Sequence, residues 1–170
     1  MRKKIFYITS VLGLTSFQLF AEESVNKLME LGGNLHILLF ISFTAISVGI
    51  LSSGYALSIS LSAYAATEQE HRTAAFIPAI MPGSQGLYSF AISFLMLQGM
   101  AEAPIRVALA GVLCGLSCLM SAIGQAKTAA SCIKSINNGQ MDSGQALIAT
   151  AVPELSALTG FAAAFLAMNG

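Results

Sequence analysis

The sequence contains little charge. Of its 170 residues, 55% are hydrophobic and only 9% are charged. A soluble domain usually carries about a quarter charged residues, so this chain lacks the polar surface that water requires. The charges balance to a net charge of zero and form no basic stripe, which argues against nucleic acid as a partner. The composition therefore predicts a protein that resides in a lipid bilayer.

Common signatures of metal and nucleotide chemistry are also missing. The three cysteines, Cys114, Cys118 and Cys132, are odd in number and stand in one hydrophobic stretch without nearby histidines or acids. This pattern argues against a disulfide framework or a zinc site and favours small apolar packing residues. No GxxxxGK[ST] loop occurs, so the chain is not expected to be an enzyme that acts on ATP. We expect no tightly bound cofactor.

Long stretches without Asp, Glu, Lys or Arg divide the chain. Residues 37–67, 73–101 and 107–126 contain none of these, and residues 143–170 contain only Glu154. Each stretch is long enough to cross the hydrocarbon core of a bilayer, which needs about 20 residues of helix. The short connections between them favour antiparallel packing of neighbouring helices. The predicted fold is an all-α membrane protein with four transmembrane helices.

The N-terminus has a different pattern. A basic start, MRKK, precedes a short apolar run that ends at the small residue Ala21. This order is typical of a secretory signal peptide. Residues 1–21 are therefore predicted to be a signal peptide or, because Leu19 fits the cleavage rule poorly, an uncleaved anchor. Residues 22–34 would form a short polar lead-in on the external side.

Basic residues indicate the orientation in the membrane. Arg72 and Lys134 lie in the first and third connections, whereas the second carries the acid Glu102 and only one basic residue, Arg106. The positive-inside rule therefore places the loops near residues 67–73 and 134–145 in the cytoplasm. Both the N- and C-termini of the mature chain are then external. A cleaved signal peptide leads to the same orientation.

The second and fourth stretches repeat each other. Residues 77–95 align with residues 148–166 at a fixed offset of 71, so that Pro82 falls on Pro153. Each proline removes one backbone hydrogen bond and should kink or loosen its helix at the same depth. The repeat identifies the chain as a duplicated helical hairpin.

The repeat also sets the expected domain boundaries. We expect residues 22–97 to form the first hairpin, with its lead-in, and residues 98–170 to form the second. The first and third stretches are rich in Gly, Ala and Ser, which let membrane helices approach closely. This pattern is typical of ordinary helix packing, and a tightly packed inner ring of helices would need the same residues.

Glu154 is the one acid inside the predicted spans. It lies about ten residues into the last span, on the order of 15 Å from the cytoplasmic end at about 1.5 Å per residue. A charge at this depth costs roughly 3 kcal/mol or more unless it is protonated, paired or bound to a cation. Such acids usually mark ion or proton paths. The structural alternative is a neutral Glu that is hydrogen-bonded to a neighbouring helix.

Neutral oxygen donors are expected at a comparable depth. Glu154 corresponds in the repeat to Gly83, so the first hairpin lacks the acid and the duplicated chain carries one acid in all at this position. Ser84 and Gln85 follow directly after Gly83, and Gln125 lies near the cytoplasmic end of the third stretch. One carboxylate among several neutral oxygens is a hard-oxygen site of charge minus one, which suits a monovalent hard cation. Each glutamine taken alone is equally well explained as an interhelical hydrogen bond.

Three motifs resemble one known family. PGSQGLYSF (82–90), AIGQAKTAAS (122–131) and VPELSALTGF (152–161) are similar, in the expected order, to the proteolipid (K) subunit of bacterial V-type ATPases. The similarity covers residues 37–170 and is greatest to the sodium-pumping members. It implies a ring of identical subunits that turns against a stator membrane subunit in the bacterial inner membrane. It also implies that every copy in the ring transports Na⁺ or H⁺ and that a central-stalk subunit meets the cytoplasmic loops.

The resemblance also implies roles for individual residues. The residues that it places around the ion are Glu154, Gln125, Gln85, Ser84 and Met81. Met81 would contribute its backbone carbonyl, and the hydroxyl of Tyr88 would support the carboxylate. Ser84 occupies a place often held by Thr, and Pro153 fills a slot that is not always proline. Neither departure removes an oxygen ligand.

Three functions are compatible with these residues. The first is a sodium-coupled rotor proteolipid. The second is the same rotor coupled to protons, with the glutamines serving as packing hydrogen bonds. The third is a small multi-span channel, transporter or structural membrane protein with Glu154 as a gating or packing acid. The duplicated hairpin disfavours the third, since transporters more often have inverted repeats and discontinuous helices.

Overall fold

The computed structural model describes residues 35–99 and 103–169. The predicted signal peptide or anchor (1–21) and the polar lead-in (22–34) lie outside these ranges. From Leu38 onward the described residues belong to one compact unit. Within it, four helical runs are long and apolar enough to cross a membrane. The predicted all-α class with four membrane spans is therefore confirmed.

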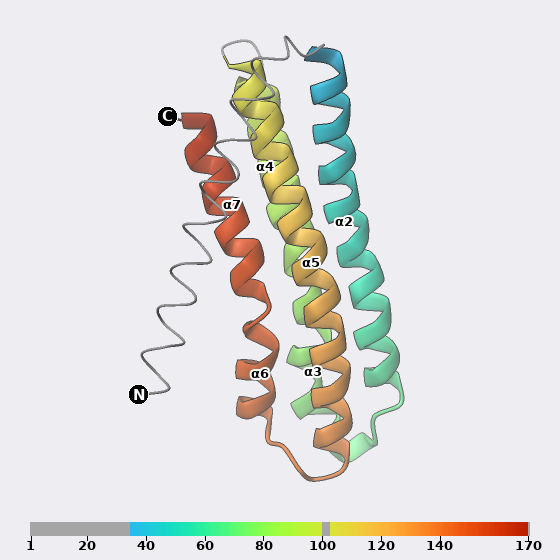
Figure 1. Cartoon of the computed structure of the whole chain (residues 1–170). Helices are drawn as coiled ribbons and strands as arrows, with labels where there is room; N and C mark the ends of the chain where they lie inside the picture. Colours follow the sequence, from blue (N-terminus) through green and yellow to red (C-terminus); the bar gives the residue numbers. More distant parts are fainter. Residues whose placement is uncertain (1–34, 100–102, 170) are drawn as a thin grey trace, which may run out of the picture. The chain divides into compact units, whose positions relative to one another are not determined.

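The elements follow one another as two antiparallel hairpins (Figure 1). The first hairpin comprises α2 (Leu35–Ala65), η1 (Gln69–His71), α3 (Arg72–Ile80), η2 (Met81–Gly83) and α4 (Ser84–Gly99). The second comprises α5 (Pro104–Asn137), α6 (Ser143–Ala151) and α7 (Glu154–Asn169). The connections after α2 and after α5 lie at the same end of this unit, as the antiparallel arrangement requires (Figure 1).

The second helix of each hairpin is broken at the same place. α3 ends at Ile80 and a 3₁₀ turn precedes α4, while α6 ends at Ala151 and a turn precedes α7. The two breaks are equivalent at the repeat offset of 71 residues. Pro82 and Pro153 cause them, because proline has no N–H to donate to the preceding helical turn. The loosening predicted from the repeated prolines is therefore present in both hairpins.

The third connection is shorter than the charge pattern predicted. Lys134 lies in the last turn of α5, which continues to Asn137, so the region 134–145 is not one loop. Gly139 adopts a φ of 67°, a conformation that glycine takes without steric cost and that turns the chain after α5. Asp142 then caps α6 by accepting a hydrogen bond from the backbone N–H of Gln145 at 2.9 Å.

Glycines bring α5 close to its neighbours on two sides. A Cβ atom at Gly115 would overlap the backbone of α2 at Ala45, and one at Gly160 of α7 would overlap the side chain of Ser117 on α5. Helices pack this closely in membranes where small residues leave room for the facing backbone. The predicted close packing of the glycine-rich stretches is therefore observed between α2 and α5.

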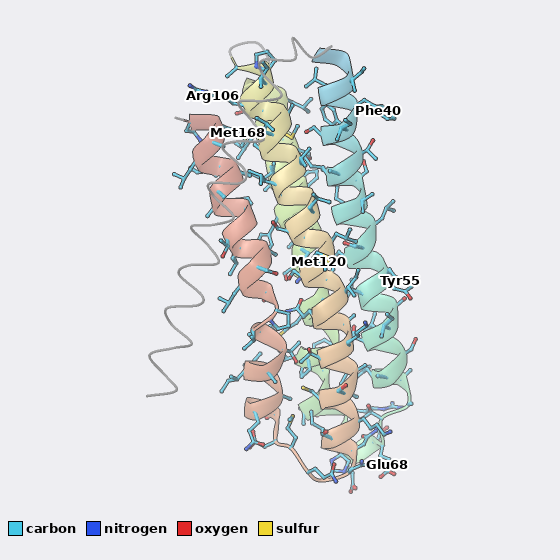
Figure 2. All side chains as sticks on the ribbon, in the orientation of Figure 1. Phe40, Tyr55, Glu68, Arg106, Met120 and Met168 are labelled. Atoms are coloured by element: carbon cyan, nitrogen blue, oxygen red, sulfur yellow. The ribbon has the colours of Figure 1, made fainter. Side chains whose placement is uncertain are left out.

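Large apolar side chains cover much of the outside of this unit. Phe40 and Leu51 of α2 are each 72% exposed, and Leu166 of α7 is 69% exposed. Figure 2 marks Phe40, Tyr55 and Met120 along this outer surface. Apolar area of this extent is unfavourable in water and fits lipid or neighbouring subunits. The three cysteines, in contrast, are free and buried, as expected for packing residues.

Candidate ion-binding site

Glu154 is the first residue of α7 and follows directly on the helix break. Its side chain is half-buried in the protomer. Oε1 of the carboxylate accepts a hydrogen bond from the Tyr88 hydroxyl at 2.6 Å. Oε2 lies 3.5 Å from Nε2 of Gln125, at the outer limit of a hydrogen bond. Each carboxylate oxygen therefore faces one donor and keeps lone-pair capacity for a cation or a proton.

Tyr88 links the two hairpins at this level. It belongs to α4, and its ring centroid lies 5.7 Å from that of Phe161 on α7, with 45° between the ring planes. This aromatic contact fixes the tyrosine against the same helix that begins with Glu154. The hydroxyl is consequently directed at the acid by packing as well as by its hydrogen bond.

Gln125 is fully buried on α5 and contacts the second break. Its Nε2 donates to the backbone carbonyl of Thr150 at 2.9 Å, in the last turn of α6. Carbonyls in a last helical turn lack part of their normal partners, so a side-chain amide is a suitable donor. The same amide nitrogen faces Glu154, which ties the acid to the end of α6.

Gln85 is also fully buried, on α4. Its Nε2 donates to Oε1 of Gln125 and lies 3.2 Å from the hydroxyl of Ser121. Its own Oε1 is buried and has no hydrogen-bond partner among the described residues. A buried acceptor left without a partner costs about 1–3 kcal/mol. This oxygen is therefore a candidate ligand for a cation or for a bound water.

Met81 and Ser84 form a separate pair beside this network. The hydroxyl of Ser84 donates to the backbone carbonyl of Met81 at 3.1 Å, at the junction of η2 and α4. Both residues are half-buried, and Ser84 directly precedes Gln85. Neither residue hydrogen-bonds directly to Glu154, but the Ser84 side chain lies close to the Tyr88 hydroxyl that donates to the acid. The structure thus joins Glu154, Tyr88, Gln125 and Gln85 by direct hydrogen bonds and places Met81 and Ser84 beside Tyr88.

Two residues of the network were not predicted. Ser121 donates to the carbonyl of Pro153 at 2.8 Å and accepts from Gln85, and the carbonyl of Thr150 accepts from Gln125. Ser121 stands one helical turn before Gln125, on the same face of α5, and this spacing could have identified it. No comparable signal marks Thr150, because its contact is made by a backbone atom.

The network contains one acid and otherwise neutral groups. Among the described residues, Glu154 has no Lys, Arg or His partner, and the one ion pair, between His71 Nε2 and Glu70 Oε1 at 3.3 Å, lies in the first connection. An ionised Glu154 would therefore give the site a charge of minus one. Such a site can be neutralised by a single proton or by one monovalent cation.

The fold and the site define a class of membrane protein that is built from two copies of a helical hairpin and carries one acid at a helix break. The family model for the C subunit of ATP synthase matches the chain twice, over residues 35–96 and 108–167, and the chain belongs to this family. The two matches confirm the duplication, one in each hairpin. No curated protein matches the chain significantly.

Family membership identifies the chain as a rotor-ring proteolipid of a rotary ATP synthase. Proteins of this kind are non-catalytic, and they form a ring of identical copies that works with a stator subunit and the rotor stalk. The apolar outer surface of the protomer is consistent with both neighbours that a ring requires, lipid and further copies of the chain. The channel, transporter or structural role that the residues alone left open is not favoured by this membership.

Proposed function

We propose that the chain is the proteolipid of a V-type rotary ATPase and that its ring carries Na⁺ on Glu154. The observation that best supports sodium is the buried Oε1 of Gln85, which has no partner among the described residues. A proton carrier needs only the acid, whereas a sodium site needs several oxygens around it. Two fully buried glutamines beside one acid are more readily explained by a cation that binds their oxygens.

The proposed ligands surround the break in the first hairpin and the start of α7. They are the carboxylate of Glu154, the side-chain oxygens of Gln125, Gln85 and Ser84, and the backbone carbonyl of Met81. Bound Na⁺ would neutralise the carboxylate while the protomer passes through lipid. A bare charge there costs about 3 kcal/mol or more. Tyr88 would hold the carboxylate in the loaded orientation through the hydrogen bond at 2.6 Å.

A proton is the alternative cargo, and one observation favours it. Gln85 and Gln125 hydrogen-bond to each other, and Gln125 also bonds to the carbonyl of Thr150, so most of their polar atoms are satisfied without a cation. In that case the glutamines stabilise the packing of α4, α5 and α6, and Glu154 alone binds the proton. The two alternatives differ in whether activity depends on the sodium concentration.

The remaining partners follow from the proposed orientation in a bacterial inner membrane. With Arg72 and Lys134 on the cytoplasmic side, the connections after α2 and α5 would meet the central stalk. At this end a groove of about 490 Å³ lies between α3 and α6, and Glu70, Ile77 and Leu147 contribute to its lining. The groove would be accessible from the cytoplasm. The stator membrane subunit would exchange the ion with Glu154 as each protomer passes.

Replacement of the acid tests the proposal. In inside-out membrane vesicles that contain the complete ATPase, Glu154→Gln should abolish ATP-driven ion transport. The matched control is Glu102→Gln, which removes an acid of the connection between α4 and α5, away from the proposed stalk contact, and should leave transport intact. Transport that persists in Glu154→Gln would overturn the proposed role of this residue, whichever ion is used.

A further inference from the structure

Two serines of α2 bind the break of the first hairpin. The hydroxyl of Ser53 lies 3.0 Å from the carbonyl oxygens of both Pro82 and Gly83. The hydroxyl of Ser60 donates to the carbonyl of Ala79 at 2.6 Å, in the last turns of α3. Both serines are buried. Their hydroxyls therefore bind the backbone where the proline interrupts the helical hydrogen bonds.

The second hairpin is bound at the same two backbone positions. Ser121 of α5 donates to the carbonyl of Pro153 at 2.8 Å, and Gln125 donates to that of Thr150 at 2.9 Å. These carbonyls belong to the repeat counterparts of the proline and the alanine bound in the first hairpin, at the offset of 71 residues. The first helix of each hairpin thus carries two polar side chains that hold the break in the second helix. In the second hairpin one of them, Gln125, is also a proposed ion ligand.

A glycine allows α2 to reach this break. A Cβ atom at Gly86 of α4 would lie 3.1 Å from Oγ and 3.2 Å from Cβ of Ser53, which is tighter than ordinary contact. Because glycine has no side chain, Ser53 can approach the carbonyls of the preceding turn. On the same side, a Cβ atom at Gly83 would lie 3.3 Å from Cδ1 of Leu57. Ser53 and Leu57 of α2 therefore pack tightly against the first hairpin's break, between Gly83 and Gly86.

We infer that Ser53 and Ser60 are positioning residues for the ion site, an inference that rests on the proposed function. Neither serine hydrogen-bonds to a proposed ligand. Their hydroxyls fix the backbone on both sides of Met81 and immediately before Ser84 and Gln85. A binding site must hold its ligands to within about 0.5 Å, and it relies on surrounding hydrogen bonds to do so. α2 carries none of the proposed ligands and thus acts on the site through the backbone of η2.

The test compares alanine variants in the assembled ATPase. Ser53→Ala and Ser60→Ala should each raise the Na⁺ concentration at half-maximal ATP hydrolysis about three- to tenfold, with the maximal rate changed by less than about twofold. Ser58→Ala is the matched control, because Ser58 is exposed on the same helix and donates only to the carbonyl of Tyr55.

Two results would overturn the positioning role of Ser53 and Ser60. The first is an unchanged Na⁺ concentration at half-maximal ATP hydrolysis in both alanine variants. The second is an equal rise of this concentration in Ser58→Ala. If Ser53→Ala prevents assembly, Ser60→Ala is judged alone by the same criterion. Wild-type activity that ignores Na⁺ would contradict sodium coupling instead. In that case the positioning role is tested by measuring the pH at which carbodiimide labelling of Glu154 is half-maximal. This pH should change in Ser53→Ala and Ser60→Ala and should stay at the wild-type value in Ser58→Ala.

Discussion

Tyr88 and Glu154 hydrogen-bond at 2.6 Å although 66 residues separate them in the sequence. The tyrosine belongs to the first hairpin and the acid to the second. The first hairpin has Gly83 at the position equivalent to the acid, yet it supplies the donor that orients the acid of the other hairpin. Residues of both hairpins therefore form the candidate site together.

Removal of this donor should weaken ion binding without abolishing transport. A hydrogen bond to a charged group contributes about 1.5–3 kcal/mol, so Tyr88→Phe should raise the Na⁺ concentration at half-maximal ATP hydrolysis by about tenfold or more. Phe retains the ring and its contact with Phe161, so the fold should be unaffected. Tyr55→Phe provides the control, because Tyr55 is 65% exposed on α2 and should give the wild-type value.

Replacement of Gln85 separates sodium coupling from proton coupling. Gln85→Leu keeps a side chain of similar size and removes both the buried oxygen and the amide donor. If Na⁺ is the cargo, the Na⁺ concentration at half-maximal ATP hydrolysis should rise by at least about tenfold, because one ligand oxygen is lost. If protons are carried, the variant should transport at close to the wild-type rate. Gln98→Leu, at an exposed position of α4, controls for the loss of a glutamine within the same helix.

Close packing of α2 against α5 should be sensitive to a single methyl group. A Cβ atom at Gly115 would overlap the α2 backbone, and added bulk in a packed interior costs about 1–3 kcal/mol. Gly115→Ala should therefore lower the temperature at which the detergent-extracted ring dissociates, as followed by gel electrophoresis. A Cβ atom at Gly54 meets nothing within 4 Å in the protomer, so Gly54→Ala should dissociate at the wild-type temperature. Equal dissociation temperatures for the two variants would contradict this packing arrangement.

The helix breaks could be predicted from the sequence because their cause is local. Pro82 and Pro153 lack the N–H of a helical turn wherever they stand, and the fixed repeat offset shows that both stand at the same depth. The four spans were equally predictable from the charge-free stretches, since the bilayer excludes charges over a set length. These features depend on single residues or on composition.

Helix ends and contacts between helices were less predictable. The third charge-free stretch ends at Ala126, but α5 continues to Asn137, because an absence of charge marks the extent of the membrane and not the end of a helix. The roles of Ser53 and Ser60 depend on which carbonyls of a neighbouring helix they reach, and serine is common throughout α2. The sequence therefore indicated that Glu154 lies close to Gln125 and Gln85, but it contained no sign of the two α2 serines that bind the first break.

The central claim, that Glu154 binds the transported Na⁺, is tested most directly by carbodiimide labelling of membranes at fixed pH with the sodium concentration varied. The reagent modifies protonated carboxyls, and bound Na⁺ should keep Glu154 from being protonated. We predict that Na⁺ protects Glu154 from labelling in the wild-type ring and that Gln85→Leu needs at least about tenfold more Na⁺ for the same protection. Labelling of Glu154 that varies with pH but not with Na⁺ would contradict the claim and assign the proton as the cargo.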